Sequence, residues 1–151
     1  MKNLEIYIHI PFCVRKCEYC DFLSFPADDD AKLRYVKGLM AEMIFYGPLM
    51  KNYQVSSVYI GGGTPSSIDE QWIAALMEGV FDCFNVLPDA EISIECNPGT
   101  LSREKLLAYR DAGINRLSIG LQSANNDELK LLGRIPVSYT HLRAHETLMN
   151  L

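Results

Sequence analysis

The chain has 151 residues, which is enough to bury a hydrophobic core within one domain. Its formal net charge of −5 argues against a basic surface for nucleic acid, so no nucleic-acid partner is expected. No apolar run has the length of a membrane span, and the first residues lack the charged-then-apolar pattern of a secretion signal. The spacing of the five cysteines is not that of a disulfide framework, so we predict a protein of the reducing cytoplasm.

The hydrophobic periodicity alternates between strand and helix along the chain. It predicts strands over residues 4–10, 55–60, 91–96 and 116–121, and helices over 30–45, 69–84, 100–113 and 126–132. Four βα units with apolar strand centres predict an α/β fold, in which helices pack against a parallel sheet. Ligands of such sheets bind beyond the carboxyl ends of the strands.

A cysteine motif follows the first predicted strand, where Cys13, Cys17 and Cys20 lie within eight residues. Disulfide pairing would leave one of the three over, whereas three thiolates can hold a [4Fe–4S] cluster and leave one iron open. The alternatives are a zinc site completed by His9, or three thiols without a ligand. Zinc fingers usually take their ligands from two separated pairs, and the two remaining cysteines fall in apolar patterns that predict burial.

Motifs of unusual residues follow the other three strands as well. Gly61-Gly-Gly-Thr-Pro65 ends the second strand, Glu95-Cys-Asn-Pro98 the third, and Gln122-Ser123 the fourth. The glycine run lets backbone approach a ligand closely, although taken alone it is explained equally well by a tight turn. It is neither a phosphate loop nor a dinucleotide fingerprint, since the Lys-Ser/Thr pair and the later glycine are absent. All four motifs fall at one end of the predicted sheet, which indicates a single site.

Together these motifs resemble those of the radical S-adenosylmethionine (SAM) superfamily. Cys-x-x-x-Cys-x-Tyr-Cys is similar to its cluster signature, and Tyr7-Ile-His-Ile-Pro-Phe together with the triple glycine resembles the anaerobic coproporphyrinogen III oxidase family, from about residue 4 to 134. The resemblance implies a truncated part of a partial (β/α)6 barrel, with residues 1–135 as the incomplete N-terminal part of the core. It also implies a [4Fe–4S] cluster and SAM as cofactors, and one-electron cleavage of SAM to a 5′-deoxyadenosyl radical.

The resemblance assigns roles to individual residues. The cluster ligands it implies are Cys13, Cys17 and Cys20. The cofactor-binding residues it implies are Tyr7, Tyr19, Gly62, Gly63, Thr64, Glu95, Gln122 and Arg134. Without the resemblance, Tyr7 would be interpreted as an inward-facing strand aromatic, and Glu95, Gln122 and Arg134 as solvated surface residues. His9 is interpreted either as a strand histidine with satisfied hydrogen bonds or as a neighbour of the cluster.

One departure from the family pattern bears on function. The oxidases have a further cysteine two residues after the third, whereas this chain has Phe22, as does the heme-chaperone branch of the family. The short segment before Leu4 fits that branch too. We therefore predict a heme chaperone that transfers heme to an acceptor protein, with an electron donor for the cluster. The alternatives are an oxygen-independent coproporphyrinogen III oxidase or a radical SAM enzyme with another substrate; this chain alone is expected to be inactive.

The family pattern ends at Ile135 or Pro136. Residues 136–151 resemble translated adapter sequence at the end of a gene fragment, so we predict that they are foreign to the parent protein and pack poorly. His141 and His145 are four residues apart, but the order is not His-Glu-x-x-His and no third ligand is apparent. A chain of four βα units would also leave the fourth strand with an unpaired edge.

Overall fold

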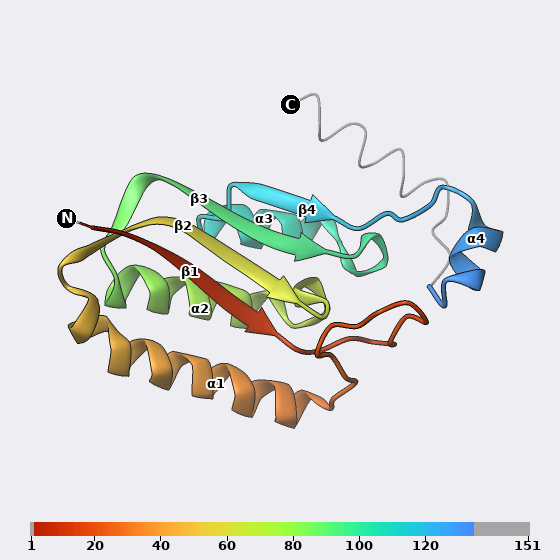
Figure 1. The fold of residues 1–151 in the computed structure, drawn as a ribbon, viewed down its shortest axis with the longest axis horizontal. Helices are drawn as coiled ribbons and strands as arrows, with labels where there is room; N and C mark the ends of the chain where they lie inside the picture. Colours follow the sequence, from red (N-terminus) through yellow and green to blue (C-terminus); the bar gives the residue numbers. More distant parts are fainter. Residues whose placement is uncertain (1, 135–151) are drawn as a thin grey trace.

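The computed structural model describes residues 2–134 (Figure 1). Over these residues the chain forms a parallel sheet in the order β1-β2-β3-β4, with strands β1 (Lys2–Ile10), β2 (Tyr53–Gly62), β3 (Val86–Cys96) and β4 (Arg116–Ile119). The helices are α1 (Asp29–Tyr46), α2 (Glu70–Cys83), α3 (Arg103–Asp111) and α4 (Asn126–Leu131), with short 3-10 turns η1 (Gly47–Met50), η2 (Pro65–Ser67) and η3 (Pro98–Thr100). The predicted α/β fold with a parallel sheet is confirmed.

Short polar side chains determine where the first three helices begin. Asp28 accepts a hydrogen bond from the Ala31 backbone N–H at 2.7 Å, and Asp69 accepts one from the Gln71 N–H at 2.8 Å. Ser102 precedes α3 and accepts a hydrogen bond from the Lys105 backbone N–H at 3.2 Å. Each cap satisfies a backbone donor that the first helical turn leaves unpaired, which fixes the helix boundary locally.

The core lies between the sheet and the helices α1 to α3, which cover one face of it (Figure 1). Ile8, Ile60 and Ile94 are register partners on that face, and none is more than 3% exposed. The inner face of α2 meets them with four side chains that are fully buried: Ile73, Leu76, Met77 and Val80. Burial of each such side chain contributes about 1.5–3 kcal/mol of transfer free energy. This packing holds the carboxyl ends of the strands in a row.

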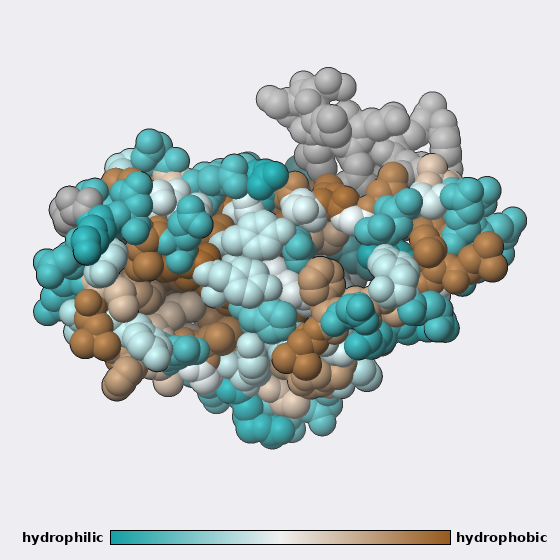
Figure 2. All heavy atoms as spheres, in the orientation of Figure 1, coloured by the Kyte–Doolittle hydropathy of each residue, from teal (hydrophilic) through white to brown (hydrophobic). Residues whose placement is uncertain are grey.

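The opposite face of the sheet is polar and aromatic. One register row there contains Tyr7, Tyr59, Ser93 and Arg116. The Tyr7 side chain is 58% exposed, so the interpretation of Tyr7 as an inward-facing aromatic is wrong. Figure 2 shows pale to teal surface over the middle of the sheet in this view, with brown apolar patches to either side. This face is covered by none of the helices α1 to α3.

Several element bounds differ from the sequence expectations; β3 begins at Val86 rather than at residue 91, and α3 begins at Arg103 rather than at residue 100. The fourth strand ends at Ile119 rather than at residue 121, because the chain turns there and Leu121 donates its N–H back to the Ile119 carbonyl. Cys96 is buried as predicted, whereas Cys83 is only partly buried at the edge of the core. No helix within residues 2–134 is long and apolar enough to cross a membrane. The predicted foreign segment, residues 136–151, lies outside the described residues.

Candidate functional site

A cavity of about 270 Å³ lies at the carboxyl ends of the strands. Its walls come from the segments after β1, β2, β3 and β4, as the sequence motifs predicted. Of the predicted site residues, all but Tyr7 line it: Cys13, Cys17, Tyr19, Cys20, Gly62, Gly63, Thr64, Glu95, Gln122 and Arg134. The structure therefore brings these residues together, and their roles toward cofactors stay predictions.

The cysteine loop is anchored at its base in the core. Phe12 is 2% exposed, and its ring packs edge-on against Phe25 and Tyr35. Backbone hydrogen bonds run from Cys13 N to Phe25 O at 3.2 Å and from Phe25 N to Pro11 O at 2.9 Å. The two ends of the loop are thus held side by side, and the cysteines lie in the segment between them.

The three loop cysteines have the donor set of an iron–sulfur cube. They are free and partly exposed. Within residues 2–134, no three His, Cys, Asp or Glu side chains converge as ligands of one metal ion would. A [4Fe–4S] cluster takes one thiolate on each iron and so does not require such convergence. The three cysteines line one cavity, as the implied cluster requires.

The surroundings of His9 argue against the zinc alternative. Its Nδ1 lies 2.9 Å from the Tyr7 hydroxyl, and its Nε2 lies 3.3 Å from the Leu23 carbonyl oxygen. Both ring nitrogens are therefore engaged by groups other than the three thiols. To act as the fourth ligand of a zinc ion on these cysteines, His9 would have to give up one of those contacts.

The glycine segment is joined to the cysteine loop through its backbone. Gly63 N–H donates to the Ile10 carbonyl at 2.8 Å, and Thr64 N–H donates to the Phe12 carbonyl at 2.7 Å. A Cβ on Gly63 would stand 2.7 Å from the Phe12 oxygen and 2.9 Å from Cys13 Sγ. Gly63 is therefore required for the close approach of two loops of the protein itself, and not only for the approach of a ligand.

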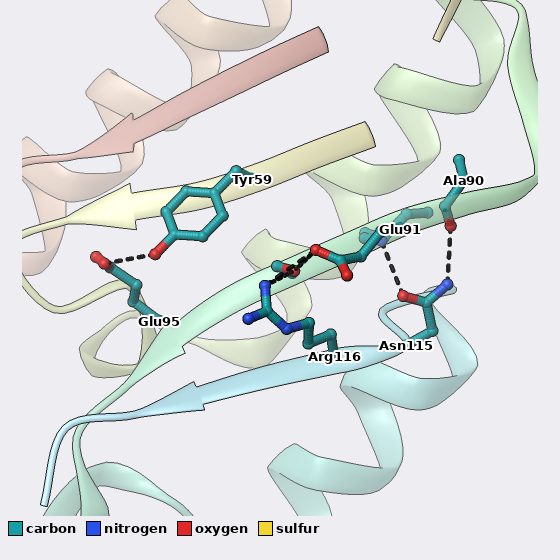
Figure 3. A network of polar contacts seen from close by, with 8 residues as sticks. Tyr59, Ala90, Glu91, Glu95, Asn115 and Arg116 are labelled. Carbon is teal, nitrogen blue, oxygen red and sulfur yellow. Dashed lines mark hydrogen bonds and ion pairs between the residues drawn. The ribbon is translucent and has the colours of Figure 1, made fainter. Parts of the chain in front are cut away.

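Gly62 and Glu95 meet at the centre of the site. Gly62 has a φ of +119°, a conformation that favours glycine, and its N–H donates to Glu95 Oε2 at 2.9 Å. Tyr59 donates to Glu95 Oε1 at 2.7 Å, and the two side chains point toward one another in Figure 3. The hydrogen bond to Glu95 is the main cause that raises the pKa of Tyr59, followed by burial. Two donors from β2 thus fix the carboxylate, which belongs to β3.

Tyr7 contacts this centre indirectly. Its ring stacks on that of Tyr59 with centroids 6.1 Å apart, and its pKa is raised by burial and by the charge of Glu95. It does not line the cavity. Tyr7 thus lies outside the lining of this cavity, and its contact with SAM stays a prediction.

The residues that follow α4 reach back to the cysteine loop. Arg134 donates through Nε to the Tyr19 hydroxyl at 2.9 Å and through Nη1 to the Gly120 carbonyl at 3.0 Å. Glu18 N–H donates to the Leu132 carbonyl at 3.4 Å. The cavity is lined by both the Arg134 guanidinium and the Glu95 carboxylate, so it carries both signs of charge.

Sequence reasoning missed Tyr59, which holds the carboxylate of Glu95, and polar pairs that lie outside the cavity lining. Tyr59 could have been found, because it lies two positions before the glycine run and so shares a strand face with it. Arg116 and Glu91 form an ion pair at 3.0 Å on the open face of the sheet, and Asn115 bridges Ile92 N and Ala90 O nearby (Figure 3). No sequence signal marked these pairs, because they depend on which strands become neighbours.

The chain matches the Radical SAM superfamily over residues 7–151. It belongs to the radical SAM superfamily. It is 41% identical over 138 residues to the heme chaperone HemW of Escherichia coli (strain K12), and this match covers 87% of the chain and 35% of HemW. It is 40% identical over 135 residues to the mitochondrial radical S-adenosyl methionine domain-containing protein 1 of Bos taurus, with 88% of the chain and 30% of that protein covered.

Among solved structures, this radical SAM chain is similar to the coproporphyrinogen III oxidase HemN from Escherichia coli. The TM-score is 0.87 at 33% sequence identity, over 95% of this chain and 33% of HemN. HemN is described as a radical SAM enzyme. The chain spans about a third of the length of the curated relatives it matches.

Proposed function

We propose that this chain is the cluster-binding and SAM-binding part of a HemW-like heme chaperone. The observation that carries the proposal is the gathering of three free thiols, a glycine backbone and a fixed carboxylate around one cavity. Membership of the radical SAM superfamily and the similarity to HemW support it. A cytoplasmic location belongs to the proposal, because thiols stay reduced there.

In this proposal Cys13, Cys17 and Cys20 hold a [4Fe–4S] cluster, whose fourth iron has no ligand from this loop. The cluster would supply an electron for the cleavage of SAM. The protein's part is to bind and orient. Glu95, fixed by Tyr59 and Gly62, offers a carboxylate to the ammonium group of SAM, and Arg134 offers a guanidinium to its carboxylate.

The alternative is oxidation of coproporphyrinogen III, which the structural similarity to HemN favours. Phe22 bears on this choice, because it lines the cavity at the position where the resembled oxidases have a further cysteine. Its ring is 66% exposed and apolar. An exposed apolar side chain at the mouth of the site is compatible with a flat hydrophobic ligand such as heme.

The test is anaerobic reconstitution of the chain with iron and sulfide, followed by absorption spectra with SAM and with heme. We expect broad visible absorbance from the cluster, a change on addition of SAM, and a heme spectrum that saturates. An assay with coproporphyrinogen III, with an intact oxidase as positive control, should show no turnover. Turnover would overturn the chaperone, and failure to load iron would overturn the site as a whole.

Transfer of heme needs an acceptor protein, and reduction of the cluster needs an electron donor. Both belong to the proposal as partners. Release of bound heme to an apo-acceptor, followed by spectral change at the acceptor, would measure the first.

A further inference from the structure

The segment that follows the glycine run is held by a lysine from another helix. Lys105, in the first turn of α3, donates through Nζ to the Ser66 carbonyl at 2.6 Å and to the Ile68 carbonyl at 2.9 Å. Ser66 and Ile68 are no more than 1% exposed, and burial lowers the pKa of Lys105. A partly buried ammonium is costly unless acceptors take up its charge, so these two carbonyls must stay in place around it.

Ser66 extends this link to the segment after β3. Its Oγ accepts from Asn97 N–H at 3.0 Å and lies 2.5 Å from Thr100 Oγ1, which in turn donates to the Asn97 carbonyl at 2.8 Å. We name Lys105, Ser66, Thr100 and Asn97 the interloop clamp. It joins three parts of the chain: the segment after β2, the segment after β3, and α3.

The interloop clamp supports two walls of the cavity from behind, through Lys105 and Ser66. Thr64 and Pro65 line the cavity on one side and Asn97 lines it on the other, whereas Lys105 and Ser66 do not line it. The Thr64 end of the segment is fixed separately, by the backbone hydrogen bonds of Gly63 and Thr64 to the cysteine loop. The two anchors are therefore independent: one faces the thiols, and the other sets the distance to the wall that contains Glu95 and Asn97.

We propose that Lys105 and Ser66 are positioning residues for SAM binding, and that they act by holding the segment after β2 against the segment after β3. This rests on the proposed function, in which SAM occupies the cavity. Loss of the interloop clamp should widen the cavity and weaken SAM binding. It should leave the cysteine loop intact, because that loop keeps its hydrogen bonds to Phe25, Gly63 and Thr64.

The experiment compares reconstituted wild type with Lys105→Met, Lys105→Arg and Ser66→Ala. Lys37→Met is the matched control, because Lys37 is an exposed lysine on α1. Three quantities are measured: iron content, the dissociation constant for SAM by equilibrium dialysis, and the change that SAM causes in the electron paramagnetic resonance spectrum of the reduced cluster. The last reports on how SAM sits against the cluster, which a loss of stability alone would not alter.

We expect Lys105→Met to keep its iron and to bind SAM about tenfold more weakly, the scale of losing hydrogen bonds from a charged donor. Its spectrum without SAM should match wild type, and its SAM-induced change should be reduced. Lys105→Arg, which retains a cationic donor, should recover most of the affinity, and Ser66→Ala should show the same defect to a smaller degree.

Affinity and spectra equal to those of Lys37→Met would overturn the inference while the proposed function stands. If Lys105→Met fails to load iron, Ser66→Ala decides by the same criteria, because it leaves both bonds to the lysine in place. A wild-type chain that loads iron but shows no response to SAM would overturn the proposed function, and the inference with it.

Discussion

On the helix-covered face of the sheet, Ile8, Ile60 and Ile94 stand in one register row and are buried almost completely. The row directly before it, on the open face, contains Tyr7 and Tyr59, which are joined by ring stacking and whose pKa values are both raised. The same strands thus satisfy two different requirements at alternate positions. Side chains on the covered face must fill the space against the helices, and side chains on the open face form hydrogen bonds and ion pairs.

The largest expected effect compares a cysteine of the cavity with a cysteine of the helical layer. Cys17→Ala should remove most of the broad visible absorbance of the reconstituted protein, because it takes away a proposed cluster ligand. Cys83→Ala, in the helical layer, should keep that absorbance, since Cys83 lies at the edge of the core. Iron and sulfide analysis checks both. Full iron loading of a chain that lacks Cys13, Cys17 and Cys20 would show that the cavity at the carboxyl ends of the strands is not the cluster site.

A second test compares stability on the two faces. Ile94→Ala should lower the free energy of unfolding by about 2–5 kcal/mol, because it leaves a cavity under α2. Tyr59→Phe should cost about 1 kcal/mol, since it removes one hydrogen bond to Glu95 while the Gly62 N–H keeps the other oxygen paired. Urea unfolding measures both. Equal losses would mean that the open face is also a packing surface.

A third test uses two glycines. Gly63→Ala should destabilise by about 1–3 kcal/mol and lower iron loading, because the new Cβ meets Phe12 O and Cys13 Sγ. Gly38→Ala, within α1, should instead stabilise by about 0.5–1 kcal/mol, because alanine favours the helix more than glycine and the new Cβ would meet no side chain or neighbouring element within 4 Å. Thermal unfolding and iron content of the two variants give the answer. A tolerated Gly63→Ala would contradict the close approach of the two loops.

The smallest effect is a pH dependence. Burial raises the pKa of the Cys96 thiol to about 12, whereas an unfolded thiol ionises near about 8.5. The folded state holds the Cys96 proton more tightly than the unfolded state does. The stability that burial of the neutral thiol contributes is therefore complete below about pH 8.5, and it is lost as the pH rises, by at most about 1.4 kcal/mol per pH unit. Between about pH 8.5 and 10, Cys96→Val should show a shallower loss of unfolding free energy than wild type. Parallel curves would mean that Cys96 is not buried in solution.

Much of the fold follows from local patterns in the sequence. Period-two apolar residues locate the strands, and the starts of α1 and α3 were predicted to within three residues. Helix starts are predictable to that extent because caps such as Asp28 and Ser102 act on residues only a few positions away. The rule that ligands bind at strand ends then brings the cysteines, the glycines and Glu95 together. Each of these inferences uses contacts that are near in sequence or fixed by sheet topology.

The parts that could not be predicted depend on long-range neighbours. The bond between Lys105 and the Ser66 carbonyl joins residues 39 positions apart, and nothing in either residue's surroundings in the sequence indicates the other. The stacking of Tyr7 on Tyr59 depends on the register between two strands, which the sequence of neither strand reveals. The close contact between Gly63 and Phe12 likewise depends on how two loops pack together, while the role of Gly63 toward a ligand stays a prediction.

The contact between Arg134 and Tyr19 has a consequence for the nascent chain. The two residues are 115 positions apart, so at a synthesis rate of about 5–20 residues per second the cysteine loop emerges roughly 6–23 s before its partner is made. During that interval three thiols are presented without the guanidinium and the Leu132 carbonyl that later hold the loop. Oxidants and stray metal ions compete for them first, so the yield of usable protein should depend on how reducing the surroundings are during translation.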